Sequence, residues 1–343
     1  MKQKPEENFK IPELLRGKTF LDPTYDAAFQ ELFSDKRTLI HFLNGILHLD
    51  TAHTVLNLEY RNPGISIAFP YPKTVRFDIR AITAEGKELD IEMQRHFHSD
   101  FNDRAILYSA MLTVGAKIDL DRKVLEMPEE EKVGRYEIPQ VISIWICKFC
   151  REDFKNFREE WALYKKSDIG NANARPVSDK IEYIFIELPK FEKKIEELEN
   201  DEDRWLFLLK NMGEEEDRPD FSDKILDSAY ERLRIKDSNP ELIERQVNDM
   251  VTEAEIETRI QDGLRDGRKV GLEQGLKEGK EIGLQQGREL GLQQGKELGL
   301  QQGKQQGIKQ AKLEMAKALK KQGVPIAIIE NTSGFSENEI RKL

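Results

Sequence analysis

Two alternating segments between Val75 and Arg95, read as VRFDIRAITAEGKELDIEMQR, constrain the fold of this chain most strongly. Side chains in a strand point to opposite faces with a period of two, so an apolar residue at every second position predicts a half-buried strand. Both segments have this pattern, and Ala84-Glu85-Gly86 between them is typical of a tight turn. The sequence therefore predicts a β-hairpin with one apolar and one polar face.

The polar face of the predicted hairpin gathers acidic side chains. The apolar face is formed by Val75, Phe77, Ile79 and Ala81 from the first strand and by Leu89, Ile91 and Met93 from the second. The opposite face carries Arg76, Asp78 and Arg80, followed by Asp90, Glu92 and Gln94. Three carboxylates in one place repel each other unless a cation lies among them, and Mg²⁺ prefers such oxygen ligands. The alternative is an ordinary amphipathic hairpin with a solvated polar face.

Two motifs in this sequence resemble one nuclease family. Asp78, a hairpin turn and then Glu92-Met93-Gln94 resemble the Asp…(Asp/Glu)-x-Lys signature of the PD-(D/E)XK nucleases, in particular the branch of recombination-promoting nucleases or putative transposases. That branch opens on a Tyr-Asp-x-Ala-Phe pattern, which is matched here by Tyr25, Asp26, Ala28 and Phe29. The resemblance covers about residues 19 to 260 and extends to the unusual tail.

The resemblance implies a metal-dependent DNA endonuclease. Asp78 and Glu92 would hold Mg²⁺, with Mn²⁺ as a substitute, and Gln94 stands where the superfamily has Lys. Supporting roles are implied for Asp26, Glu31, Asp90, Arg104 and Tyr108. Because Gln carries no charge, it cannot stabilise the reacting phosphate as Lys does. The competing interpretation is therefore a degenerate nuclease fold that serves as a noncatalytic, oligomeric binding module.

Composition and periodicity predict an α/β (α+β) domain with an appendage. The chain has 343 residues, of which 38% are apolar and 34% charged. Strand patterns occur at 56–62, 140–147, 159–165 and 181–188, with a connection rich in Pro and Gly up to residue 72, and helical patterns occur at 19–50, 100–117 and 201–257. This order is typical of a restriction-endonuclease-like mixed sheet flanked by helices. We expect an N-terminal extension (1–18), a nuclease-like domain (19–249), a repeat tail (250–310) and a short helical motif (311–343).

Charge and cysteine content narrow the setting. The sequence contains neither an apolar run of membrane-spanning length nor a secretory h-region, so we expect a cytoplasmic protein without a membrane segment. Cys147 and Cys150 form a CxxC pair without the further ligands of a zinc site, and we interpret them as incidental thiols. His96 and His98 would share a face with Glu92 only if the strand extends that far. A net charge of −10 requires that DNA be bound through a local basic groove.

The tail repeats glycine at every fourth position from 263 to 307. On a helix such a stripe advances by about 40° per repeat, so it winds around the axis and is not a heptad seam. Twelve glycines would cost an isolated helix roughly 12 kcal/mol relative to alanine. Either the tail is a helix that self-associates through Leu276, Leu284, Leu292 and Leu300, giving a homo-oligomer, or it is a flexible spacer. In the family that this chain resembles, C-terminal fragments from internal initiation act as inhibitors, and Met250 is the hypothetical start here.

Overall fold

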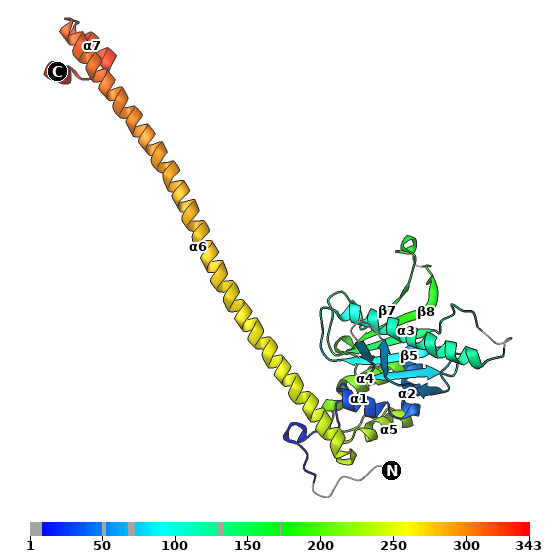
Figure 1. Ribbon diagram of the computed structural model, residues 1–343. Coiled ribbons are helices and arrows are strands. Elements are labelled where there is room, and N and C mark those ends of the chain that lie inside the picture. The colour runs from blue at the N-terminus through cyan, green and yellow to red at the C-terminus, as the bar shows by residue number, and fades with distance from the viewer. Residues whose placement is uncertain (1–8, 50–52, 68–72, 129–132, 172) are drawn as a thin grey trace. The chain divides into compact units, whose positions relative to one another are not determined.

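The computed structural model describes residues 9–49, 53–67, 73–128, 133–171 and 173–343. The chain divides into two compact units, Met1–Glu255 and Ile256–Leu343, which are described separately (Figure 1). In the part of the chain that is described, no helix is long and apolar enough to cross a membrane.

The first unit is built around a six-stranded mixed sheet. Its strands, in the spatial order β1-β4-β5-β6-β8-β7, are β1 (Leu58–Tyr60), β4 (Ile79–Thr83), β5 (Glu88–Gln94), β6 (Val141–Cys147), β8 (Ser178–Glu187) and β7 (Arg158–Leu163). The β5–β6 and β6–β8 pairs are parallel, and the other pairs are antiparallel. The two remaining strands, β2 (Gly64–Ile67) and β3 (Lys73–Arg76), form a separate antiparallel pair. The predicted mixed sheet is confirmed.

Helices cover both faces of this sheet (Figure 1). One face packs against α1 (Asp26–Leu32), α2 (Lys36–Leu47), α4 (Asp201–Asn211) and α5 (Lys224–Arg232), and the other face packs against α3 (Phe101–Glu126). Every residue of β5 and β6 is buried, as expected of central strands with parallel partners. In β6, Ile142, Ile144 and Ile146 join the large core under α2 and α4, while Trp145 packs on Phe101 of α3.

The prediction of an unbroken first strand in the hairpin is wrong. That strand was expected to run through Val75, Phe77, Ile79 and Ala81. The chain leaves the strand conformation at Phe77 and Asp78, because β3 pairs with β2, within the stretch that we predicted as a connection, and the amide of Phe77 donates to Pro63 O at 2.9 Å. As a result Val75 and Phe77 pack beside Met111 on the α3 face, whereas Ile79 and Ala81 pack in the core on the other face.

The second half of the predicted hairpin agrees with the structure. β4 and β5 are antiparallel and pair Arg80 with Asp90 and Ile79 with Ile91. The turn between them has Gly86 at a φ of +84°, a left-handed conformation that a residue without Cβ adopts at no steric cost. The amide of Gly86 donates to Thr83 O at 3.0 Å and closes the turn.

The long helix α6 (Pro240–Lys321) contributes its first turns to the first unit and the rest to the second. The glycine repeat is therefore helical in this structure. A Cβ added at any repeat glycine from 263 to 307 would meet open space, so packing within the chain does not require glycine at these positions. Beyond it, α7 (Ile326–Ser333) and α8 (Glu337–Lys342) fold back on the end of α6 around Ala316, Ile329 and Ile340.

Candidate metal centre

Two backbone amides, those of Asp78 and Met93, hold the carboxylates of Asp78 and Glu92 together. Asp78 lies between β3 and β4, opposite the C-terminal half of β5, which carries Glu92. The amide of Asp78 donates to Glu92 Oε1 at 3.1 Å, and the amide of Met93 donates to Asp78 Oδ2 at 2.8 Å. Each carboxylate thus has one oxygen fixed by a backbone N–H. The break in the strand explains this arrangement, because it leaves the Asp78 amide free to bind a side chain instead of a neighbouring strand.

The remaining oxygen of Glu92 has only long contacts. Gln94 Nε2 lies 3.4 Å from Glu92 Oε2, and Arg104 Nη2 lies 3.9 Å from it. Glu92 is nevertheless 1% exposed, so little water compensates for the missing partners. A fully buried carboxylate without close donors is costly, which makes this oxygen a candidate ligand for a cation.

Asp90, two residues earlier on β5, is a third carboxylate and is fully buried like Glu92. Ser143 Oγ donates to Asp90 Oδ2 at 2.8 Å, and Trp145 Nε1 donates in turn to Ser143 Oγ at 2.9 Å. Asp90 Oδ1 is buried and has no hydrogen-bond partner among the described atoms. We call Asp78, Asp90 and Glu92 the acid cluster.

The acid cluster is deficient in positive charge. The pKa of Asp78 is raised to about 7, mainly by burial; the hydrogen bond from the Met93 amide lowers it in part, and the charge of Asp26 raises it by more than Arg104 lowers it. Burial likewise raises the pKa values of Asp90 and Glu92, and the negative charge of Asp78 raises both further. A bound cation would reverse these shifts, because it favours the ionised form of each acid.

The donor set of the acid cluster fits a hard divalent cation. Mg²⁺ is typically held by one or two carboxylates, keeps several waters and takes its other ligands from substrate phosphates. Asp78 and Glu92 offer one unfixed oxygen each, and the unpartnered Oδ1 of Asp90 shows that the surrounding protein does not satisfy the cluster. The residues present therefore fit the ion that this fold implies.

Arg104 and Tyr108 lie one helical turn apart on α3 and face the acid cluster. Arg104 Nη2 donates to the Tyr108 hydroxyl at 3.1 Å, and its guanidinium lies 4.9 Å from the centre of the tyrosine ring. The ring packs edge-on against Phe77 and Trp145. Burial raises the pKa of Tyr108, so its hydroxyl remains a proton donor at neutral pH. The structure thus brings both predicted residues to the site.

Of the other predicted residues, some lie near the acid cluster and some lie elsewhere. Asp26 at the start of α1 is exposed and close enough to raise the pKa of Asp78. Glu31 lies instead in another cavity, 3.7 Å from Arg232. β5 ends at Gln94, so the condition for a site that joins His96 and His98 to Glu92 is not met. His96 is 3.4 Å from Glu253, and His98 is exposed. Cys147 and Cys150 are free thiols.

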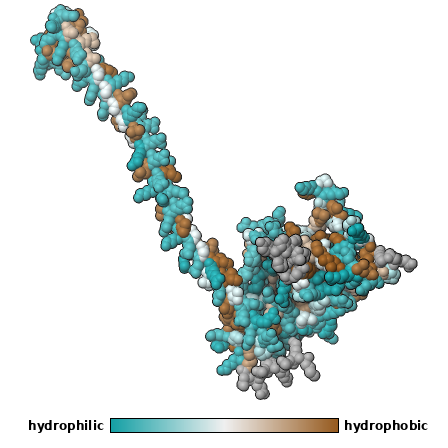
Figure 2. Space-filling model, in the orientation of Figure 1, coloured by the Kyte–Doolittle hydropathy of each residue, from teal (hydrophilic) through white to brown (hydrophobic). Residues whose placement is uncertain are grey.

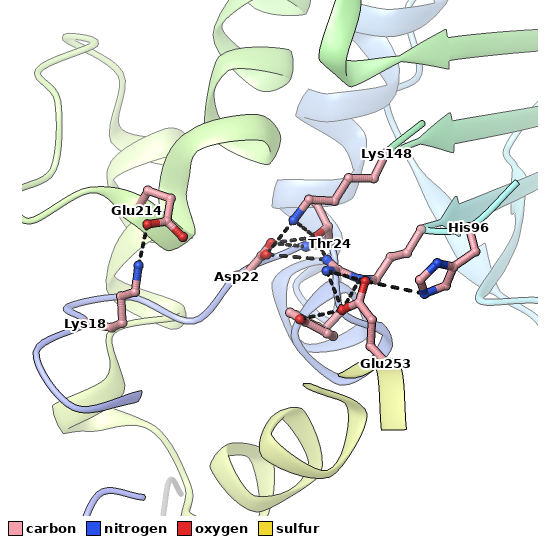
Figure 3. A network of polar contacts seen from close by, with 9 residues as sticks. Lys18, Asp22, Thr24, His96, Lys148, Glu214 and Glu253 are labelled. Atoms are coloured by element: carbon pink, nitrogen blue, oxygen red, sulfur yellow. Dashed lines mark hydrogen bonds and ion pairs between the residues drawn. The ribbon is translucent and has the colours of Figure 1, made fainter. Parts of the chain in front are cut away.

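A second polar cluster begins at Arg95, directly after β5, and Figure 3 shows Asp22, Thr24, Lys148 and Glu253 of this cluster. The guanidinium of Arg95 makes a bidentate contact with Glu253 on α6, with a shortest distance of 2.7 Å, and its carbon lies 3.6 Å from the centre of the Tyr25 ring. Tyr25 also donates its hydroxyl to Glu253 at 2.7 Å. Arg95 therefore ties the end of β5 to the first turns of α6.

The same cluster contains a second ion pair. Lys148 Nζ lies 2.9 Å from Asp22 Oδ2, which is also 3.4 Å from Arg95 Nη1, and Thr24 accepts from both cations. Burial alone would raise the pKa values of Asp22 and Glu253, but these cations and hydrogen bonds outweigh it and lower both. We call Asp22, Thr24, Tyr25, Arg95, Lys148 and Glu253 the Arg95 network. Sequence analysis missed it, since no local pattern links residues more than 150 positions apart.

In the described part of the chain, one group of three acidic or histidine side chains has its ligand atoms within 4.8 Å of one another, and it is not the acid cluster: it consists of His41, Asp201 and Asp223. His41 Nε2 lies 3.2 Å from Asp223 and 3.8 Å from Asp201. However, Trp205 Nε1 donates to His41 Nδ1 at 3.0 Å, and an indole N–H can only donate. A neutral imidazole that accepts at Nδ1 carries its proton on Nε2, so that nitrogen has no lone pair for a metal. The group is a structural link among α2, α4 and α5.

Comparison with known proteins agrees with this geometry. No curated protein and no solved structure matches the chain. The family described as PD-(D/E)XK nuclease family transposase matches residues 23–262, which is more than half of the chain and includes the acid cluster, α3 and all of the Arg95 network except Asp22. The chain therefore belongs to the PD-(D/E)XK nuclease family of transposases.

Proposed function

We propose that the protein is a Mg²⁺-dependent DNA endonuclease of the recombination-promoting, transposase-like type. Family membership supports a nuclease or transposase type of activity. The observation that carries the finer proposal is the pairing of Asp78 and Glu92, in which each backbone amide fixes one oxygen of a carboxylate and leaves the other available. DNA mobility and phage defence are the processes in which such an activity would serve, and free cysteines suit a cytoplasmic enzyme.

Asp78 and Glu92 would hold the ion. Bound Mg²⁺ would supply Lewis-acid stabilisation of the phosphate and a nucleophilic hydroxide near neutral pH. Gln94, whose Nε2 lies 3.4 Å from Glu92, would orient the attacking water or the scissile phosphate by hydrogen bonding. Asp90, two residues before Glu92 on β5, would add negative charge to the site.

Arg104 would supply the positive charge that Gln94 lacks. Its guanidinium is 3.9 Å from Glu92, and Tyr108 holds it through a hydrogen bond and its ring. A guanidinium can bind two phosphate oxygens at once, so Arg104 is suited to stabilise charge that develops on the phosphate. Removing it should therefore slow cleavage more than removing Gln94.

Nicking of supercoiled plasmid tests the proposal. Wild type should nick in Mg²⁺ or Mn²⁺ and stop in chelator, and Asp78→Ala should lose turnover by several orders of magnitude. Asp179→Ala is the matched control, because it removes an exposed carboxylate of the same charge on β8. The uncharged Gln94 favours one alternative, a noncatalytic binding module. Absence of cutting by folded wild type with both metals would support that alternative.

The repeat helix would make the protein a homo-oligomer. Leu276, Leu284, Leu292 and Leu300 are each more than half exposed, and Figure 2 shows apolar side chains in separate patches along α6. Open space at the glycines would let a second helix approach closely. Gly283→Ala with Gly291→Ala should raise helicity and weaken assembly in sedimentation. In a simple spacer, only helicity should rise.

A fragment that begins at Met250 would carry Glu253 and the repeat without the acid cluster. We propose it as an inhibitor that joins full-length chains through the repeat. A ribosome profile without initiation at Met250 would exclude its synthesis.

A further inference from the structure

A groove of about 350 Å³ opens directly beside Asp78. Its walls come from three places in the fold: the end of α1, the connection between β1 and β2, and the break between β3 and β4. Its lining includes Gln30, Ser34, Tyr60, Arg61, Arg76 and Asp78. We call this cavity the Asp78 groove. A molecule that reaches Asp78 from this side must pass along these residues.

Two arginines in the Asp78 groove form no ion pair with an acid in the described part of the protein. Among the described residues, neither Arg61 nor Arg76 has a salt bridge or a side-chain hydrogen bond, and Arg61 Nε is buried without an acceptor. A third arginine of the lining, Arg80, is occupied by Glu88 at 3.3 Å and Asp119 at 3.5 Å. Arg61 acts on Glu88 only through its charge, so two guanidinium groups without a hydrogen-bonded acid in the described chain lie beside the carboxylate of Asp78 and make the groove locally basic in a chain whose net charge is −10.

An aromatic ring completes the Asp78 groove. Tyr60 is 44% exposed, although its hydroxyl donates to the backbone oxygen of Phe33. The hydroxyl anchors the ring, which stays in contact with solvent. A fixed, exposed aromatic face beside cationic side chains is the combination that nucleic-acid-binding proteins use to stack bases and hold phosphates.

We infer that the Asp78 groove binds the DNA strand next to the bond that is cut. Arg61 and Arg76 contact its phosphates, and Tyr60 stacks on one of its bases. This inference rests on the proposed function for the identity of the ligand. It also answers how an acidic protein binds a polyanion, since the required cations lie at the site itself. A small free anion would need the arginines but would have no use for the ring.

Fluorescence anisotropy of the full-length protein with a labelled single strand and with its duplex tests the inference. Ca²⁺ replaces Mg²⁺, so that the carboxylates hold a cation while cutting is suppressed. The slope of log Kd against log salt counts phosphate contacts, at about 0.9 each on duplex and 0.7 on a single strand. Arg61→Gln with Arg76→Gln should lower the slope by about 1.8 on duplex and weaken binding roughly tenfold or more.

Matched variants separate the groove from general charge. Arg135→Gln with Arg175→Gln removes the same charge from two exposed arginines outside the groove, and its slope should stay at the wild-type value. Arg61→Lys with Arg76→Lys should restore most of the slope, because lysine keeps the phosphate charge. Tyr60→Leu should weaken single-strand binding by roughly tenfold with no change in slope, while Tyr60→Phe binds as wild type.

An unchanged slope in the Gln pair, or an equal fall in the control pair, overturns the inference. Thermal melting must show that the Gln pair is folded, which we expect because neither arginine has an ion pair or a side-chain hydrogen bond with a described residue to lose. If the Gln pair lowers the slope but wild type never nicks plasmid, the groove binds DNA and the nuclease proposal is refuted. If wild type nicks plasmid but the Gln pair keeps the full slope, the nuclease proposal stands and the groove inference is refuted.

Discussion

Two polar clusters involve the C-terminal end of β5, and they balance charge in opposite ways. The acid cluster has two buried carboxylates, a partly exposed third and one guanidinium at 3.9 Å, and the pKa values of its acids are raised. The Arg95 network has two carboxylates and two cations in close contact, and the pKa values of its acids are lowered. The clusters meet at the end of β5, where Glu92 belongs to one and Arg95 to the other, and both contain acids that burial alone would shift in the same direction, so burial alone does not account for the difference.

The difference separates a structural role from a binding role. In the Arg95 network the protein supplies every counter-charge, so the cluster stabilises the fold as it stands. In the acid cluster the protein fixes the acids and leaves the charge uncompensated, which costs stability that an incoming cation restores. An unbalanced cluster held by rigid elements is therefore the better candidate for a functional site.

The largest expected effect is on turnover. Glu92→Gln keeps the shape of the side chain but removes the charge that would hold Mg²⁺, so single-turnover nicking should fall by about 10³-fold or more. Glu253→Gln makes the same change in the Arg95 network and should lose less than about tenfold. Equal losses in the two variants would mean that the clusters do not differ in role.

The next effect is on stability. Arg95→Ala leaves the partly exposed Glu253 without its cation, while Asp22 keeps Lys148, so urea unfolding should show a loss of about 2–3 kcal/mol, below the cost of breaking a fully buried pair. Arg135→Ala, at an exposed position, should change stability by less than about 0.5 kcal/mol. A loss below 1 kcal/mol for Arg95→Ala would show that the network contributes little.

A smaller effect has the opposite sign. The folded pKa of Asp78 is about 7 and its ordinary value is 3.8, so the metal-free fold loses stability as pH rises from about 4 to 7. Asp78→Asn removes this penalty and should stabilise the metal-free protein by about 1–3 kcal/mol at pH 8, with little effect at pH 4. Asp22→Asn should destabilise at pH 8, because its folded pKa is lowered. Thermal melts in chelator at both pH values test the two signs.

The smallest effect concerns the third cluster. His41→Gln removes hydrogen bonds to Trp205 and Asp223 and should cost about 1–2 kcal/mol. Mn²⁺ affinity should not change, because His41 Nε2 carries a proton. A drop in Mn²⁺ affinity would place a metal site there.

Local patterns predicted the fold class and the strand that carries the candidate site residues. The alternation in ELDIEMQ determines which side chains of β5 point to each face of the sheet. Asp90, Glu92 and Gln94 therefore share one face. The turn at Gly86 then fixes the antiparallel partner. These features depend on residues close in sequence.

The break at Asp78 and the Arg95 network were not predictable in this way. Val75 to Ala81 alternates perfectly, and only the pairing of β3 with β2 interrupts it, which is a tertiary effect. Arg61 lies in the Asp78 groove because its amide donates to Arg80 O of β4 at 2.8 Å, which is again a contact between distant segments. The contact between Arg95 and Glu253 joins segments 158 residues apart, and no periodicity reports such a distance. Glu31 was predicted as a supporting residue but lies in another cavity, because helical spacing does not determine which residues of other elements a side chain contacts.

Mn²⁺ binding to wild type, Asp78→Asn and Asp22→Asn, followed by electron paramagnetic resonance of the free ion, tests the central claim most directly. We predict that wild type and Asp22→Asn remove Mn²⁺ from solution with similar affinity, whereas Asp78→Asn loses this binding by at least tenfold. If Asp78→Asn binds Mn²⁺ as tightly as wild type, the acid cluster is not the metal centre.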